Sequence, residues 1–394
     1  MIKWLCIPLL IWGIATLFYA FEIMLKSSMG SISDLFSVEF SLSNTQLASL
    51  SSAFYFTYII LQIPSGILID KYGVRKMLIV AVIAALVGTL IFSIGGSFEI
   101  FLLARILMGV CGSLGFLCAI TLAVQWFSIK NFALFAGLTN FIGYFGGALS
   151  GMPLTVLLTK TSWQSVYLSF TVICIIILIS SFLFVHDNNS IAKNKNKHEN
   201  INFKEVLRSI FKLDIVANGI FCATTMGATF ALCDLWGRDF LLSLGYSNYY
   251  SSLAGNSLIF IGIAISAPLW GLLIRILTAK YLLMIGAILG FVASSVYLYL
   301  ALPIVVLCIF SLCIGVSQSS HILSFSYVHD SVDKKVISAV FAFVNLCGVA
   351  GGAIVQLVIG ILLDRHVPKE IVMSIIPLLF FVAFIMSLMM RKNK

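Results

Sequence analysis

The sequence has few charged residues and many apolar ones. Asp, Glu, Lys and Arg make up 10% of the 394 residues, whereas hydrophobic residues make up 61%. An average soluble protein has about 25% charged residues. So little charge excludes a soluble globular protein of this size and indicates a chain that lies mostly within a lipid bilayer.

Several catalytic and metal-binding signatures are also absent. The sequence contains no GxxxxGK(S/T) phosphate loop, no HExxH motif and no GxSxG motif. Its nine cysteines form no CxxC, and we interpret them as apolar packing residues. We therefore expect no enzyme, no bound cofactor and no metal, and any uphill work must draw on an ion gradient.

Apolar runs of membrane-spanning length are what the sequence does contain. A helix that crosses the bilayer needs about 20 mainly apolar residues. Twelve stretches meet this condition: 4–27, 45–69, 77–97, 100–127, 132–159, 165–186, 213–238, 248–273, 278–299, 302–326, 336–362 and 371–390. We predict an all-α membrane protein with twelve transmembrane helices.

The Lys and Arg residues are distributed unequally between the predicted loops. If the amino terminus is cytoplasmic, 18 of the 24 fall in cytoplasmic segments. Because cytoplasmic loops are enriched in Lys and Arg, we expect a multi-pass protein of the bacterial inner membrane with both termini in the cytoplasm. The basic residues lack interleaved aromatic residues, so we expect no nucleic-acid partner.

One polar stretch divides the helices into two sets of six. It separates residues 1–186 from residues 213–394, and we interpret residues 187–212 as a cytoplasmic linker ending in a short amphipathic helix at 203–212. FYAFEIMLK at 18–26 resembles FALCDLWGR at 230–238, and NFIGYFGGA at 140–148 resembles NLCGVAGGA at 345–353. We predict two pseudo-symmetric six-helix bundles with a site between them, the architecture of a rocking transporter.

The first of these repeats places an acid and a base one helical turn apart in each half. Glu22 and Lys26, like Asp234 and Arg238, are spaced i,i+4 and would share a helix face. Charges inside spanning helices are costly and by default mark a substrate or proton pathway. We expect Glu22 to carry a coupling proton, with Asp234 as the second candidate. The alternative is that each pair is a static ion pair that fixes helix packing.

The segment GILIDKYGVRK resembles the loop between helices 2 and 3 of the major facilitator superfamily. Its matching residues are Gly66, Asp70, Lys71, Gly73, Arg75 and Lys76. The resemblance implies the major facilitator fold and a latch that closes the inner side of the outward-open state. The alternative is that the basic residues of this loop only set the topology.

Helix 4 carries a second resemblance to the same superfamily. RILMGVCG is similar to its Arg-x-x-x-Gly pattern, with Arg105 and Gly109 at the matching positions. The resemblance implies that Arg105 pairs with the Glu22 carboxylate and either exchanges that partner for substrate or loses it on protonation. The alternative is that Arg105 extends to the outer membrane surface.

Within the superfamily, the sequence resembles the phagosomal nutrient transporters of intracellular bacteria. The similarity rests on SSMGSISDLF after Lys26, on LSSAFYFTYIILQIPSGILIDKYGVRK at 50–76 and on LWGRDFL at 235–241. It implies import of amino acids or similar small nutrients. We expect a monomer embedded in the lipid bilayer.

Polar and aromatic residues on the predicted core helices complete the candidate site. Such a set suits a zwitterion, because bases hold its carboxylate, acids hold its ammonium and aromatic rings surround its side chain. The expected substrate contacts are Tyr19, Lys26, Tyr55, Tyr58, Asn140, Trp236, Arg238, Gln318, His321 and Asn345. The alternatives are that Asn140 and Asn345 bond neighbouring helices and that His321 is a packed polar residue.

These features together predict a proton-coupled importer of an amino acid or a comparable small organic nutrient. Two alternatives stay open. One is a siderophore or metabolite transporter, including an exporter, on the same fold. The other is a receptor that binds a small molecule without moving it.

Overall fold

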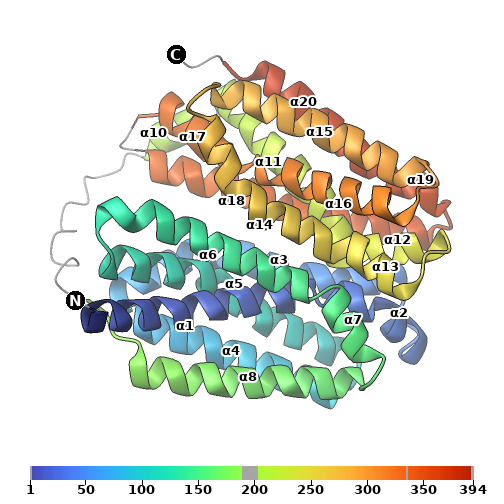
Figure 1. The fold of residues 1–394 in the computed structure, drawn as a ribbon, viewed down its shortest axis with the longest axis horizontal. Helices are drawn as coiled ribbons and strands as arrows, with labels where there is room; N and C mark the ends of the chain where they lie inside the picture. The colour runs from blue at the N-terminus through green and yellow to red at the C-terminus, as the bar shows by residue number, and fades with distance from the viewer. Residues whose placement is uncertain (1, 189–202, 334–335, 392–394) are drawn as a thin grey trace. The chain divides into compact units, whose positions relative to one another are not determined.

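The computed structural model describes residues 2–188, 203–333 and 336–391, and within them every regular element is a helix (Figure 1). In this part of the chain twelve helical segments are long and apolar enough to cross a membrane, which confirms the predicted fold class. The helices form two compact units. One comprises Met1–Ser41 with Ser49–Asn196, and the other comprises Leu42–Ala48 with Lys197–Lys394.

The first unit has six spanning segments, of which two are interrupted. One break lies at Ser28 and the other at Ser150 and Gly151. α1 packs against α5 and α6, and α4 packs against both α5 and α8. The helices are α1 (Ile2–Ser27), α2 (Met29–Glu39), α3 (Asn44–Tyr72), α4 (Val74–Ile94), α5 (Phe98–Trp126), α6 (Ile129–Leu149), α7 (Met152–Leu158) and α8 (Trp163–Phe184).

The second unit also has six spanning segments, and two of them contain a π-helical turn, η1 and η2. α11 packs against α18 and α20, and α14 packs against α16. The elements are α10 (Phe203–Ile210), α11 (Leu213–Ala231), η1 (Leu232–Trp236), α12 (Gly237–Ser243), α13 (Asn248–Ser252), η2 (Leu253–Ser257), α14 (Leu258–Leu273), α15 (Ala279–Tyr299), α16 (Ile304–Ser319), α17 (Ile322–Ser331), α18 (Ile337–Asp364), α19 (Lys369–Met373) and α20 (Ile375–Met389).

The predicted linker is described only at its two ends. Residues 189–202 lie outside the described part of the chain. The expected amphipathic segment is present as α10, and its Val206 is buried in the apolar core of the second unit. α10 thus packs on the helices of its own unit.

Four spanning segments are at least three residues longer than predicted. The first runs over Ile7–Glu39, the second over Asn44–Tyr72, the seventh over Leu213–Ser243 and the tenth over Ile304–Ser331. The predicted spans end where polar residues interrupt the apolar runs. In the structure several of these polar side chains form hydrogen bonds inside the protein, so the helical segment continues past them. The Ser28 hydroxyl, for example, lies 2.7 Å from the Tyr167 hydroxyl.

Glycines from the second sequence repeat play the same packing role in both units. Gly146 of α6 lies against the carbonyl of Ala20 in α1, and Gly351 of α18 lies against the carbonyl of Ala223 in α11. A methyl group at either glycine would overlap the neighbouring backbone. Small residues allow such close approach of helices, so these glycines join equivalent helix pairs in the two halves.

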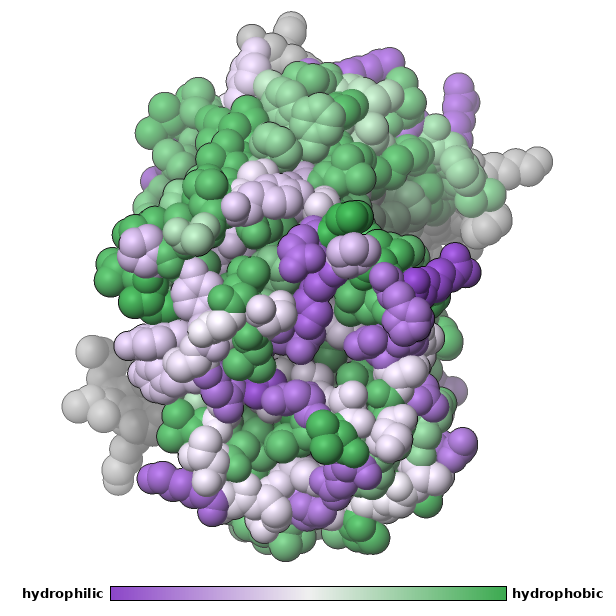
Figure 2. Space-filling model, turned by 90° about the vertical axis from the view of Figure 1, so that its right-hand side faces the viewer, coloured by the Kyte–Doolittle hydropathy of each residue, from purple (hydrophilic) through white to green (hydrophobic). Residues whose placement is uncertain are grey.

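Hydrophobic side chains cover the flanks of the helices. Ile60, Ile67 and Phe182, for example, are each at least 60% exposed. Figure 2 shows hydrophobic residues along the flanks, whereas hydrophilic residues are spread over the middle and lower parts of the face toward the viewer. Exposed apolar area of this extent requires lipid to cover it.

Candidate functional site

Glu22 lies near the middle of the first spanning segment, and only 3% of the residue is exposed. Its carboxylate faces α5: a Cβ atom on Gly112 would lie 3.2 Å from Oε1, and one on Gly115 would overlap Oε2. Within the described residues, no hydrogen-bond donor reaches Oε2. A buried carboxylate with one oxygen lacking a donor is costly when charged, and a proton removes that cost.

Lys26, one turn beyond Glu22, is also buried. Its Nζ lies 5.2 Å from the centre of the Tyr55 ring. Tyr19 lies one turn before Glu22 and is buried, and Tyr58 lies one turn along α3 from Tyr55 and is half-buried. The first unit therefore places an acid, a base and aromatic rings on the adjoining helices α1 and α3.

Arg105 is fully buried, and its three guanidinium nitrogens donate to backbone carbonyls. Nη1 donates to Leu25 O at 2.8 Å, Nη2 to Lys26 O at 3.0 Å and Nε to Leu50 O at 3.0 Å. The last carbonyls of a helix have no partner inside the helix. Arg105 therefore caps the end of α1, next to the break at Ser28.

These hydrogen bonds differ from the expected pairing of Arg105 with Glu22. The α5 residues beside the Glu22 carboxylate are Gly112 and Gly115, two to three helical turns from Arg105. The alternative, in which Arg105 extends to the surface, is wrong because none of the residue is exposed.

Asp234 lies in the π-helical turn η1 and is fully buried. The Cys233 thiol donates to its Oδ1 at 3.6 Å. Arg238 is 5% exposed and donates from Nε and Nη2 to Asn248 Oδ1, at 3.0 and 2.8 Å. Since π turns form i to i+5 hydrogen bonds, the backbone around Asp234 differs from the regular α-helix around Glu22.

Three other expected contact residues lie in the second unit. Trp236 is buried, and its indole nitrogen donates to Gln356 O at 3.2 Å, so it is fixed to α18. Gln318 is fully buried at the end of α16. His321 is half-buried in the break before α17, with Nδ1 2.9 Å from Gln318 O.

The two asparagines of the second repeat are half-buried. Asn140 donates to Ala136 O at 3.2 Å, within its own helix. Asn345 lies at the corresponding place in α18, three residues before Gly348.

The loop between α3 and α4 is held by a residue that the sequence interpretation did not single out. Asp187, just past α8, accepts hydrogen bonds from the backbone nitrogens of Val74 at 2.8 Å and Arg75 at 3.4 Å. The Arg75 guanidinium donates to Phe182 O at 2.6 Å. Asp187 thus caps the amino terminus of α4, where negative charge is stabilising.

The other residues of the loop signature are more open. Asp70, Lys71 and Lys76 are exposed. Gly73 has φ of +88° and lies against the Asp187 carboxylate, so a side chain there would be strained. A Cβ atom on Gly66 would meet no described atom within 4 Å.

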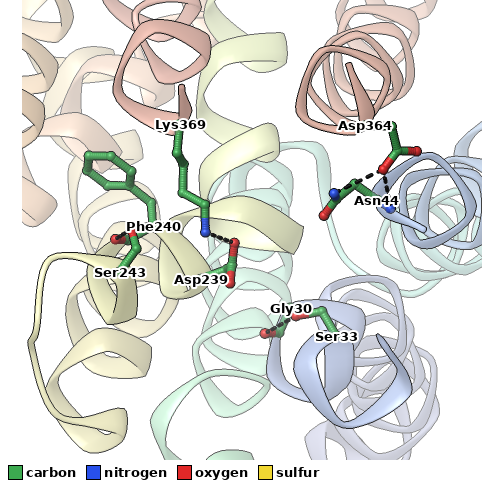
Figure 3. Close-up of polar contacts among 8 residues, drawn as sticks. All are labelled: Gly30, Ser33, Asn44, Asp239, Phe240, Ser243, Asp364 and Lys369. Carbon is green, nitrogen blue, oxygen red and sulfur yellow. Dashed lines mark hydrogen bonds and ion pairs between the residues drawn. The ribbon is translucent and has the colours of Figure 1, made fainter. Parts of the chain in front are cut away.

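A second carboxylate caps a helix within the other unit (Figure 3). Asp364, at the end of α18, accepts hydrogen bonds from Asn44 N at 2.9 Å, Asn44 Nδ2 at 3.0 Å and Thr45 N at 2.8 Å. Lys369 pairs with Asp239 at 2.8 Å nearby. Three hydrogen bonds to one carboxylate fix the first turn of α3.

The chain is similar to a known protein family and to solved structures of transporters. Residues 11–355 match the family described as Major Facilitator Superfamily. A bacterial homologue of the human lysosomal transporter Spinster, in an inward-facing and unoccupied conformation, aligns over 98% of both chains with a TM-score of 0.77 and 14% identity. A mutant of the nucleoside transporter NupG aligns over 97% of this chain and 98% of its own, with a TM-score of 0.78 and 12% identity. At such identities the structures show the fold alone.

Curated relatives match shorter parts of the chain. A probable sulfoacetate transporter of Cupriavidus necator is 25% identical over 40% of this chain and 37% of its own length. A nitrate/nitrite transporter of a Picosynechococcus species is 32% identical over 30% and 22%, and a probable L-galactonate transporter of Escherichia coli is 26% identical over 39% and 34%. The chain thus matches less than two fifths of the length of each of these relatives.

Proposed function

Because the chain belongs to the major facilitator superfamily, we propose that it is a proton-coupled secondary transporter that imports an amino acid across the bacterial inner membrane. Membrane transport follows from the family, whereas the substrate and the coupling ion are proposals. The observation that carries the coupling is the Glu22 carboxylate, buried at mid-span with Oε2 lacking a donor among the described residues. Such a group can take up a proton and return it when its surroundings change.

The membrane potential and pH gradient would supply the energy. One charge moved through 100 mV gains about 2.3 kcal/mol. That gain corresponds to about a fiftyfold concentration ratio, since 1.4 kcal/mol is a factor of ten. Coupling to one proton therefore suffices for uptake of a scarce nutrient.

The substrate proposal rests on Lys26. A buried ammonium beside an aromatic ring offers a charge-assisted hydrogen bond to a carboxylate and an apolar wall next to it. The named relatives support an anionic group on the substrate, since sulfoacetate, nitrate and galactonate are anions. An amino acid shares the carboxylate with them and adds an ammonium. The resemblance to the phagosomal nutrient group favours the amino acid.

A small organic anion without an ammonium is the second candidate, and the names of the relatives favour it. Competition separates the two. Labelled amino acid uptake into proteoliposomes should be inhibited by other amino acids, whereas organic acids and sulfonates should leave it unchanged. Uptake of the organic acid with no uptake of any amino acid would select the second candidate.

The coupling test compares two acids of the first unit. Glu22→Gln should abolish accumulation driven by a pH gradient and retain counterflow, which exchanges substrate without net proton movement. Glu99→Gln is the matched control, because Glu99 is exposed at the start of α5 and bonds to Ser97. Full accumulation by Glu22→Gln would remove Glu22 from the mechanism.

A further inference from the structure

A pocket of about 280 Å³ lies at one end of the second unit, between the end of α14 and the start of α15. Its wall consists of residues 274–280 together with Tyr327 and Asp330 of α17. Protein sites for drug-sized molecules have volumes of about 300–1,000 Å³. This pocket is therefore of a size that suits one small polar group.

Hydrogen bonds to the end of α20 fix two sides of this pocket. Lys280 donates from Nζ to Leu388 O at 3.0 Å and to Met390 O at 2.5 Å, which joins the first turn of α15 to α20. The Tyr327 hydroxyl accepts from Arg391 N at 2.9 Å, which joins α17 to the same end of α20. The pocket is therefore preformed, and a ligand can enter it without rearranging these helices.

The lining of the pocket offers positive charge and hydrogen-bond donors. Arg275 is an exposed guanidinium in the loop between the two helices. Thr278 directly precedes α15, and its hydroxyl neither caps that helix nor has another hydrogen-bond partner in the part of the chain described. The first N–H groups of α15 have no partner inside the helix, and a helix amino terminus attracts anions. These donors together match the oxygens of a phosphate group.

The lining also contains an acid, Asp330. Its carboxylate is exposed, and Oδ1 lies 3.1 Å from His329 Nδ1. Arg275 and Lys280 outnumber this acid, so the side chains of the lining carry a net positive charge. Asp330 opposes the binding of an anion, whereas Arg275 favours it, and the two residues therefore predict opposite effects when each is neutralised.

Apolar side chains of the same loop indicate where the phosphate comes from. Ile276 is 78% exposed and Leu277 is 40% exposed, and both line the pocket. The loop joins two membrane-spanning segments, which end at Leu273 and begin at Ala279. Its apolar side chains therefore lie at the boundary between headgroups and acyl chains, where apolar and basic residues together bind lipid. A free phosphate ion has no use for them, whereas a phospholipid has.

We propose that this pocket binds the headgroup phosphate of a membrane phospholipid. Arg275, Thr278 and the first N–H groups of α15 hold the phosphate oxygens, and the acyl chains of the lipid lie against Ile276 and Leu277. The bound lipid connects the end of α14 to the start of α15 on the outside of the second unit. This site depends neither on the identity of the transported substrate nor on proton coupling.

Binding is tested on the purified full chain in detergent with phosphatidylglycerol, and native mass spectrometry gives the dissociation constant of the first lipid bound. Arg275→Gln should weaken binding about fivefold, because one basic residue near the membrane surface contributes about 1 kcal/mol. Asp330→Asn should tighten binding, because it removes the repulsion of the phosphate. Arg365→Gln and Asp333→Asn are the matched controls, since both residues are exposed outside the pocket. Wild-type affinity in both pocket variants would overturn the proposal.

Hydrogen exchange followed by mass spectrometry tests the position and the chemistry of the bound group. The first turn of α15 should exchange more slowly in nanodiscs of phosphatidylglycerol than in nanodiscs of digalactosyl diacylglycerol, a bilayer lipid without phosphate. Thr278→Val should reduce this difference. Equal exchange in the two lipids would overturn the proposal. Slower exchange on addition of inorganic phosphate to the galactolipid nanodiscs would overturn the assignment to a lipid and indicate a site for a free anion.

Discussion

Glu22 and Gly115 occupy complementary space: Oε2 of the carboxylate lies where the first side-chain atom of any larger residue at position 115 would stand. Glycine in α5 thereby leaves room for the acid of α1. The contact joins the first and fourth spanning segments at the group we assign to proton coupling.

The first prediction follows from this contact. Gly115→Ala should displace the Glu22 carboxylate and sharply reduce pH-gradient-driven accumulation in proteoliposomes, because the neighbouring α1 backbone leaves little space for it to move. Gly137→Ala is the control, since a Cβ atom there meets nothing within 4 Å. Undiminished accumulation by the Gly115→Ala protein would show that the position of the carboxylate does not matter.

The second prediction concerns the Arg105 cap. Arg105→Lys replaces a planar fork that reaches three carbonyls with a single ammonium group, and we expect a loss of about 2–3 kcal/mol in the free energy of unfolding. Thermal unfolding in detergent measures the change. Arg365→Lys, at an exposed residue, should leave the melting temperature unaltered. If Arg105→Lys unfolds like the wild type and alters only the coupling, the cap is unimportant and the role in proton exchange gains support.

The third prediction compares the two carboxylate caps. Asp364→Ala should speed amide exchange in the first turn of α3, and Asp187→Ala should do so at Val74 and Arg75, each with a loss of about 1 kcal/mol of local stability. Hydrogen exchange followed by mass spectrometry resolves the two segments. Each variant serves as the control for the other. If either variant exchanges faster both at the start of α3 and at the start of α4, the substitution destabilises the protein as a whole and the carboxylate is not a local cap.

The fourth prediction tests the ring beside Lys26. Tyr55→Phe keeps the aromatic face and should retain substrate affinity, whereas Tyr55→Leu removes it and should weaken binding about tenfold, equivalent to about 1.4 kcal/mol. Ligand-induced thermal stabilisation of the purified protein gives the affinities. Equal affinities in the two variants would show that the aromatic ring at position 55 does not contribute to substrate binding.

Twelve spanning helices and the repeated glycine-rich segments could be read from the sequence because both are local patterns. Apolar length sets the spans, and Gly146 and Gly351 recur in similar segments. The ends of the spans were less accurate. Buried serines such as Ser28 and Ser31 look like loop residues in the sequence, yet hydrogen bonds to other helices retain them inside the fold.

The partners of the charged residues could not be read in the same way. Arg105 binds carbonyls that are free only because α1 breaks at Ser28, and no side-chain pattern records that break. Asp187 appeared to be the first residue of a linker, whereas its function depends on where α8 ends relative to α4. An acid directly after an apolar run was the only available signal.

The glycine contacts also compare the positions of the two acids. Ala20 packs against Gly146 and Ala223 packs against Gly351, so this contact relates α1 to α11 at an offset of 203 residues, not the 212 that matched FYAFEIMLK with FALCDLWGR. At an offset of 203, Thr225 stands where Glu22 does, and Ser31 stands where Asp234 does. The two units therefore share a packing contact, whereas each has its own buried acid at a different position along its helix.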